Sequence, residues 1–177
     1  MTRQRLAPSE LGRLFALVRR SCRRWECQPY YAVDEAELQA WRDGRVLPES
    51  QEDQEWEAYI RDLRAAAIPF ERVRMVHEPV TEYQRWIHST TDRNVRLGED
   101  VRWLAESDAR RLAMPADDFY LIDDQCVAVL RFDRLGEMKS VDVDDDAGVV
   151  ARYRTYGDRA WAVATEHHLY DPAHGEC

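Results

Sequence analysis

Hydrophobic residues recur along the chain with two different periods, and these periods predict helices and strands. Apolar positions spaced by three and four share one face of a helix, and they predict helices over 9–25, 34–43, 50–67 and 144–165, with shorter ones from Thr81 and over 107–112. Alternating apolar and polar positions predict a strand over 70–76, and shorter strands are expected over 100–104 and 137–143. Two apolar runs on either side of Asp124-Gln125 predict a hairpin over 119–132. The sequence therefore predicts an α+β or α/β fold, with one mixed sheet flanked by helices and an N-terminal helical segment.

Several helix ends and turns carry their own signals. Asp34 with Glu37 three residues later is a variant of the capping box, and Gly44 predicts the end of that helix. Residues 94–98 have the composition of a loop. Paired acids at 117–118 and 123–124 flank a strand, and they fit turn and cap roles better than a carboxylate cleft.

The length of 177 residues fits one domain over 1–177, in which residues 1–48 are a possible helical subdomain and 170–177 a mobile tail. No apolar run approaches the roughly 18–20 residues of a membrane-spanning helix. The first residues are too polar for a signal peptide. A cytoplasmic protein is therefore expected.

The net charge of −9 is unevenly distributed. Residues 1–30 hold seven Arg and two Glu, whereas 31–58 and 117–146 are strongly acidic. On the expected first helix, a basic patch would consist of Arg13, Arg19, Arg20, Arg23 and Arg24. Because the acidic segments can neutralise so short a patch, direct nucleic-acid binding is not expected, and a protein partner or a second copy of the chain fits better. The large excess of Arg over the single Lys139 indicates a high-GC genome.

The junction after the strand 70–76 is the preferred place for a pocket, since ligands often bind where strands of α/β proteins end. His77 ends this strand and His88 lies on the next helix. The candidate residues for binding a small anionic ligand are Arg72, Arg74, His77, Tyr83 and Arg85. A packed junction with exposed arginines is nevertheless the preferred interpretation of these residues, and the ligand site is the alternative.

A second group of chemically capable residues lies at the C-terminus, namely His167, His168, His174 and Cys177. Their spacing matches no closed zinc pattern, so a solvated tail is the preferred interpretation over a metal site, and no cofactor is expected. Nucleophile-elbow, P-loop and dinucleotide-binding motifs are absent from the sequence.

A run of separated motifs resembles an actinobacterial family of domains of unknown function. The motifs keep order and spacing across residues 11–172: Arg24-Trp25-Glu26, Trp41 to Gly44, Val73 to Tyr83, Asn94 with Gly98 to Leu104, and Asp118 to Asp124. The resemblance implies genes encoded beside helix-turn-helix regulators, and it brings no established activity.

A weaker resemblance is to one lobe of the phospholipase D fold. It is carried by the strand ending Val73-Arg74-Met75-Val76, the hairpin from Phe119 and a closing helix that ends near Trp161. That family's catalysis uses an H-x-K pair with a following Asp, and no His precedes Lys139 at that spacing. The resemblance implies a catalytically inactive lobe used as a sensor.

The leading hypothesis is a non-enzymatic cytoplasmic accessory or ligand-sensing module that works with a helix-turn-helix transcriptional regulator. The alternative is a small enzyme of specialised metabolism in which His77, His88 and Asp123 act as acids and bases.

Overall fold

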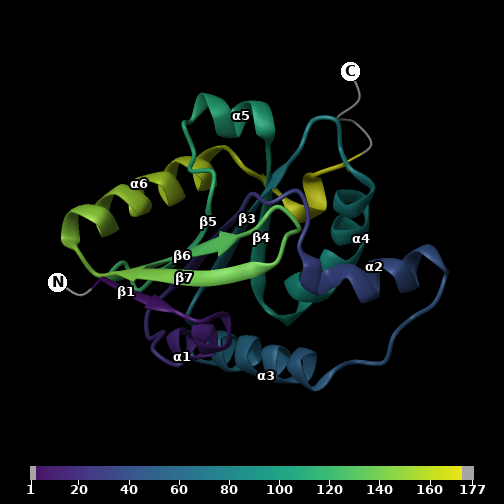
Figure 1. Cartoon of the computed structure of the whole chain (residues 1–177), viewed down its shortest axis with the longest axis horizontal. Helices are drawn as coiled ribbons and strands as arrows, with labels where there is room; N and C mark the ends of the chain where they lie inside the picture. Colours follow the sequence, from purple (N-terminus) through teal and green to yellow (C-terminus); the bar gives the residue numbers. More distant parts are fainter. Residues whose placement is uncertain (1–2, 173–177) are drawn as a thin grey trace.

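The computed structural model describes residues 3–172, which fold around one eight-stranded mixed sheet (Figure 1). The strand order is β1-β7-β6-β5-β2-β3-β4-β8. The strands are β1 (Arg3–Leu6), β2 (Cys22–Glu26), β3 (Phe70–Val76), β4 (Glu99–Ala105), β5 (Asp118–Ile122), β6 (Cys126–Phe132), β7 (Met138–Asp144) and β8 (Thr165–Glu166). The expected single mixed sheet of an α+β protein is confirmed.

The sheet changes direction at β2. This strand pairs in parallel with β3, which pairs in parallel with β4, and it pairs antiparallel with β5 on its other side. The rest of the sheet is antiparallel. Because β2 and β3 have neighbours on both sides, their side chains lie in the centre of both sheet faces.

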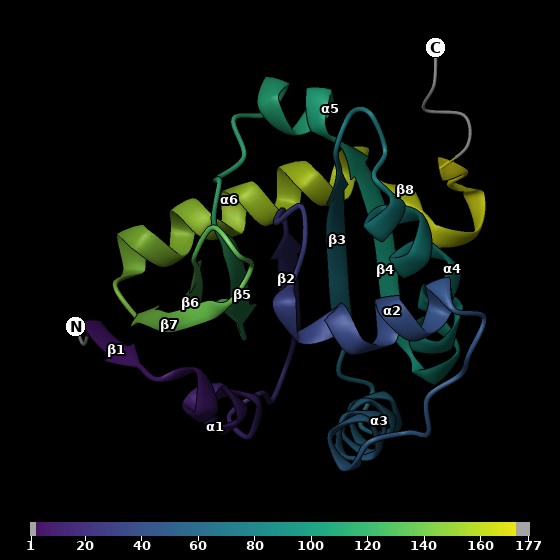
Figure 2. The same ribbon diagram turned by 45° about the vertical axis from the view of Figure 1, so that its right-hand side comes forward.

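Helices cover both faces of the sheet (Figure 2). One face, here called the α6 face, lies under α5 (Glu106–Arg111) and α6 (Ala147–Val163). The opposite face, called the α3 face, lies under α1 (Leu11–Phe15), α2 (Glu35–Arg42), α3 (Gln51–Ala65) and α4 (Glu82–Leu97). Short 3₁₀ turns occupy Pro8–Glu10, Ala32–Asp34 and His167–Leu169. No described helix combines the length and apolar composition needed to cross a membrane.

The expected first helix over 9–25 is wrong. Only Leu11–Phe15 is α-helical, and Cys22–Glu26 is strand β2. The spacing of three between Cys22 and Trp25 imitates a helix, but the two side chains point to opposite faces of a sheet that is buried on both sides. With β1 also in the sheet, the segment 1–48 contributes two strands to the main core as well as helices.

Other element ends differ in smaller ways. The expected loop over 94–98 is wrong, because α4 continues to Leu97 and Gly98 ends it with φ +129°. Asp34 precedes α2, but its side chain makes no capping hydrogen bond and accepts one from the Tyr83 hydroxyl instead. Ser50 does cap α3, and it forms a capping box with Asp53.

Candidate ligand-binding site

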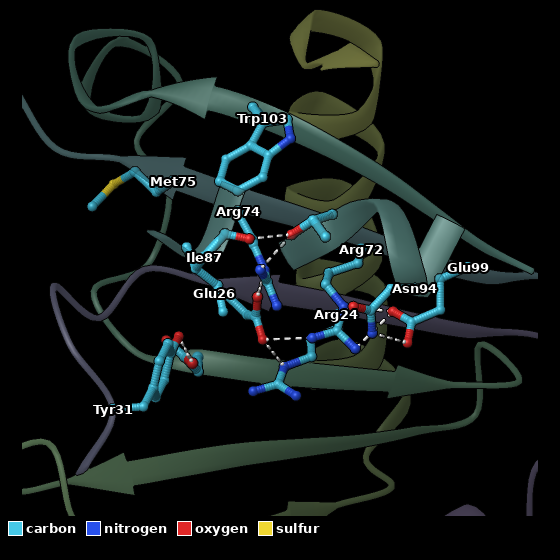
Figure 3. Close-up of polar contacts among 12 residues, drawn as sticks. Arg24, Glu26, Tyr31, Arg72, Arg74, Met75, Ile87, Asn94, Glu99 and Trp103 are labelled. Carbon is cyan, nitrogen blue, oxygen red and sulfur yellow. Dashed lines mark hydrogen bonds and ion pairs between the residues drawn. The ribbon is translucent and has the colours of Figure 1, made fainter. Parts of the chain in front are cut away.

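A row of buried charged side chains crosses the centre of the α3 face (Figure 3). It consists of Arg24 and Glu26 from β2, Arg72 and Arg74 from β3, and Glu99 from β4. Their side chains are between 0% and 16% exposed. Charges are seldom buried without partners, so the contacts of this charged row decide what it can do.

The sheet register brings these residues together. β2 and β3 are parallel, and Arg24 is paired with Arg72 and Glu26 with Arg74. Alternate residues of a strand share a face, so all four side chains project toward α4 rather than toward α6. Glu99 starts the next strand, which pairs in parallel with β3.

Glu26 is the centre of the charged row, and three guanidinium groups converge on it (Figure 3). Arg72 Nη1 donates to Glu26 Oε1 at 2.9 Å, and Arg74 Nε donates to the other carboxylate oxygen. Burial by itself would raise the pKa of Glu26, but the Arg24, Arg74 and Arg72 charges hold it well below its usual range.

Arg72 and Arg74 use most of their donors on protein groups. Arg72 Nε donates to Glu99 Oε2 at 2.8 Å, so this side chain bridges two carboxylates. Arg74 Nη1 donates to Thr91 Oγ1 at 3.0 Å. Glu99 also accepts from the Trp56 indole and the Asn94 amide. These bonds fix both arginines in place.

Arg24 is less completely bonded. Its Nε lies 2.8 Å from Glu26 Oε1, yet this buried nitrogen makes no hydrogen bond of acceptable geometry. Its Nη1 donates to the Tyr120 hydroxyl, and its Cζ lies 4.8 Å from the centre of the Tyr120 ring. Arg24 therefore combines a rigid position with unused hydrogen-bonding capacity.

Two carboxyl groups flank the charged row and are held by tyrosines. Asp118, which is fully buried, accepts from the Tyr31 hydroxyl at 2.6 Å and from the Cys27 backbone N–H at 2.9 Å. Asp34 accepts from the Tyr83 hydroxyl. Burial raises the pKa of both carboxyl groups.

A cavity of about 560 Å³ opens above the charged row. Polar side chains of the sheet form its floor, and apolar side chains from β6, β7 and α1 form one wall. Its lining comprises Leu11, Arg24, Glu26, Tyr31, Ala32, Val33, Asp34, Arg72, Arg74, Tyr83, Ile87, Tyr120, Leu130, Phe132, Gly136, Glu137 and Met138. This volume is in the usual range for small-molecule sites.

A backbone contact between two distant segments closes the roof of the cavity. The Ala32 N–H donates to the Gly136 carbonyl at 2.9 Å, which joins the turn before α2 to the β6–β7 turn. A Cβ at Gly136 would lie 2.6 Å from the Tyr30 carbonyl oxygen, and this residue has φ +74°. The roof therefore requires glycine here.

Three of the five predicted ligand-binding residues, Arg72, Arg74 and Tyr83, line this cavity. The expectation of exposed arginines on the strand is wrong, because Arg72 and Arg74 are 6% and 13% exposed. His77 and Arg85 lie outside the cavity lining. The His77 ring faces Glu106 at 3.6 Å, and Arg85 Nη1 donates to the Val80 carbonyl.

The three residues of the acid–base alternative are not brought together. Asp123 lies in the β5–β6 turn, where it accepts from the backbone N–H groups of residues 19, 20 and 21. That turn adjoins the start of β3, whereas His77 follows its end, roughly 20 Å away for a seven-residue strand. His88 instead contacts the Tyr170 carbonyl. The turn role expected for Asp123 is confirmed.

Two of the four C-terminal candidates, His167 and His168, lie among the described residues, and they differ in burial. His167 is buried, accepts a hydrogen bond from Trp103 Nε1 at 3.0 Å and lies 3.0 Å from Asp92, while His168 is exposed. Tyr170, expected in a mobile tail, stacks on Trp103. His174 and Cys177 lie outside the described residues. Among residues 3–172 no cluster of His, Cys, Asp or Glu has the arrangement of a metal site.

Arg24, Glu26 and Tyr120 are not predicted from the sequence as site residues, because they belong to strands that are covered on both faces. The prediction that places Arg24 on a basic helix is wrong, since it lies on β2. Arg23 points to the other face, where it pairs with Glu71 and Asp158. The usable signal was the alternation of Arg72 and Arg74 with apolar residues, which predicts a charged row on one strand face.

Comparisons with solved structures agree on the fold. Nuc from Salmonella typhimurium, a phospholipase D family member, is similar with a TM-score of 0.56 and 9% identity, covering 93% of this chain and 97% of that one. NucT from Helicobacter pylori is similar with a TM-score of 0.58 and 13% identity, covering 93% of this chain and 98% of that one. The likeness shows a phospholipase D-like fold. The H-x-K pair is absent, since Glu137 stands two residues before Lys139.

Comparisons by sequence identify the family. No curated protein matches the chain. The model of a domain of unknown function, DUF6879, matches residues 9–172, which is nearly the whole chain. The chain therefore belongs to the DUF6879 family.

Proposed function

We propose that this chain is a non-enzymatic ligand-sensing module that works with a helix-turn-helix transcriptional regulator. The observation that carries the proposal is the cavity of about 560 Å³ above a fixed row of buried arginines. A pre-formed pocket with a few convergent polar groups is the usual form of a small-molecule site.

The bonding of the ionisable groups at the cavity favours binding over catalysis. Glu26 is ion-paired to three arginines, and its pKa is lowered, so it is a poor base at neutral pH. The Tyr83 hydroxyl is bonded to Asp34, and burial raises the pKa of the tyrosine. These groups suit recognition of a fixed shape and charge.

The regulator is proposed from the family resemblance in the sequence, which implies genes beside helix-turn-helix regulators. The experiment is co-purification of the tagged chain with the regulator encoded next to its gene, in the presence and absence of a bound small molecule. Retention of the regulator, altered by the small molecule, is expected. Failure to retain it under either condition would refute the regulatory part of the proposal.

The sensing part is tested separately by calorimetric titration of the purified chain with defined anions: inorganic phosphate, citrate, benzoate and decanoate. At least one is expected to bind with one-to-one stoichiometry. If none binds, the cavity is not a small-anion site and this part of the proposal fails.

A further inference from the structure

The cavity has two chemically different halves. Arg24, Arg72 and Arg74 lie in its floor with Glu26. The apolar part of the lining comes from α1, β6 and β7, namely Leu11, Leu130, Phe132 and Met138. A ligand that satisfies both halves needs a charged end and an apolar body.

The sign of the charged end follows from the ion pairs. Three guanidinium groups share two carboxylates, Glu26 and Glu99, which leaves one positive charge in excess within the charged row. Asp34 and Glu137 also line the cavity, and the charge of Asp118 acts on Arg24. Glu137 pairs with Lys139, and burial raises the pKa of Asp34 and Asp118, which favours their neutral forms. A single negative charge near the arginines would complete the pairing.

Arg24 is the residue best placed to receive that charge. Its Nε is buried without a hydrogen bond, and no described residue accepts from its Nη2. By contrast, all three Arg72 nitrogens contact carboxylate oxygens. A guanidinium held by a central strand and stacked on a tyrosine ring offers a pre-organised fork for an oxyanion.

We propose that the cavity binds an amphipathic monoanion, with its carboxylate or phosphate head on Arg24 and its apolar body along the wall of Leu11, Leu130, Phe132 and Met138. This inference rests on the proposed sensing function and names the class of ligand. The apolar wall contributes affinity through burial, and the arginine selects for charge.

The test compares ligands that share one apolar body. The full chain is titrated by calorimetry with decanoate, decyl phosphate, decanol and decyltrimethylammonium, each below its micelle concentration, and with acetate and inorganic phosphate. Decanoate or decyl phosphate is expected to bind at least tenfold more tightly than decanol and than the short anions. Which of the two binds more tightly identifies the head group.

Two substitutions locate the site. Arg24→Met is expected to reduce the ratio of anion affinity to decanol affinity to less than threefold. Met138→Gln is expected to lower the affinities for decanoate and for decanol by the same factor. Arg13→Met is the matched control, because Arg13 is exposed and pairs only with Glu10. If Arg24→Met does not fold, the wild-type comparison of anion with decanol still decides the question.

The outcomes separate the two proposals. Equal binding of decanol and decanoate, or an unchanged preference in Arg24→Met, would overturn the amphipathic-anion assignment. Binding of citrate without any binding of decyl ligands would also overturn it while leaving the sensing function intact. If no compound binds in either titration, both the sensing function and the amphipathic-anion assignment are refuted.

Discussion

The two faces of the same sheet each carry an apolar cluster, but they differ at the centre of the sheet. On the α6 face, the buried cluster is entirely apolar and includes Trp25, Phe119, Val127 and Ala160. On the α3 face, the same strands present a row of buried arginines and glutamates beneath a large cavity. Strand β2 makes the contrast clearest, because Trp25 belongs to one face and its neighbours Arg24 and Glu26 to the other.

The two faces therefore have different roles, since the α6 face mainly stabilises the fold and the α3 face carries the candidate binding site. Burial of apolar area on the α6 face stabilises the fold without any need for specific partners. A buried ion-pair group adds little net stability over an apolar core, but it is costly to disrupt. The α3 face therefore holds a rigid polar site beside its own apolar cluster, and sites that break the apolar pattern are often functional.

The largest effect is expected from Phe119→Ala on the α6 face. Phe119 is 1% exposed and contacts Tyr153 with ring centres 4.9 Å apart, so its loss leaves a cavity in the packed cluster. The free energy of unfolding should fall by about 3–5 kcal/mol in urea denaturation. Binding of decanoate should stay within about twofold of wild type. A selective loss of binding would show that the two faces are not independent.

Removal of the central carboxylate by Glu26→Gln should be nearly as severe. It leaves Arg24 and Arg74 without the carboxylate that they share, and Arg72 with Glu99 alone. Breaking a buried ion pair costs about 3 kcal/mol or more. Urea denaturation measures the change, and the exposed Glu52→Gln is the control. A cost below about 1 kcal/mol would mean that the charged row tolerates unpaired charge, contrary to the proposed rigidity.

The cavity roof can be tested with two glycines that share a positive φ. Gly136→Ala brings a Cβ to 2.6 Å from the Tyr30 carbonyl, whereas Gly44→Ala at φ +65° meets nothing within 4 Å. The Gly44 variant should lose only the roughly 1–2 kcal/mol of left-handed backbone strain. The Gly136 variant should lose more and should bind decanoate more weakly. Equal losses would show that the roof contact is unimportant.

The smallest effect is expected at Asp123, whose carboxylate accepts backbone N–H groups of residues 19–21. Asp123→Asn keeps a residue that tolerates φ +55° but weakens these bonds, at a cost of about 1–2 kcal/mol at pH 7.

The same variant has a defined pH dependence. These bonds lower the pKa of Asp123 against the opposing effect of burial, so its contribution is present above the unfolded pKa of about 3.9 and is lost as pH falls through the folded value. The difference between wild type and Asp123→Asn should therefore shrink below about pH 4. Asp124→Asn, exposed and with the same φ, is the matched control for removing a carboxylate from this turn.

The sequence alone determined most of the elements. The predicted bounds of strand 70–76 are confirmed, because Arg72 and Arg74 alternate with Val73 and Met75 and Pro69 precedes the strand. The hairpin over 119–132 and the helices over 50–67 and 144–165 were also found, since their turns and caps are local signals. These features depend on residues close together in the chain.

Only the tertiary structure decided where β2 lies and what the site contains. A strand buried on both faces loses the alternation that would reveal it, so residues 22–26 resembled a helix. A buried Arg or Glu is stable only with partners. Apart from each other, Arg24 and Glu26 find theirs on strands 46 or more residues away. The charged row could be assembled only once the sheet order had brought β2, β3, β4 and β5 side by side.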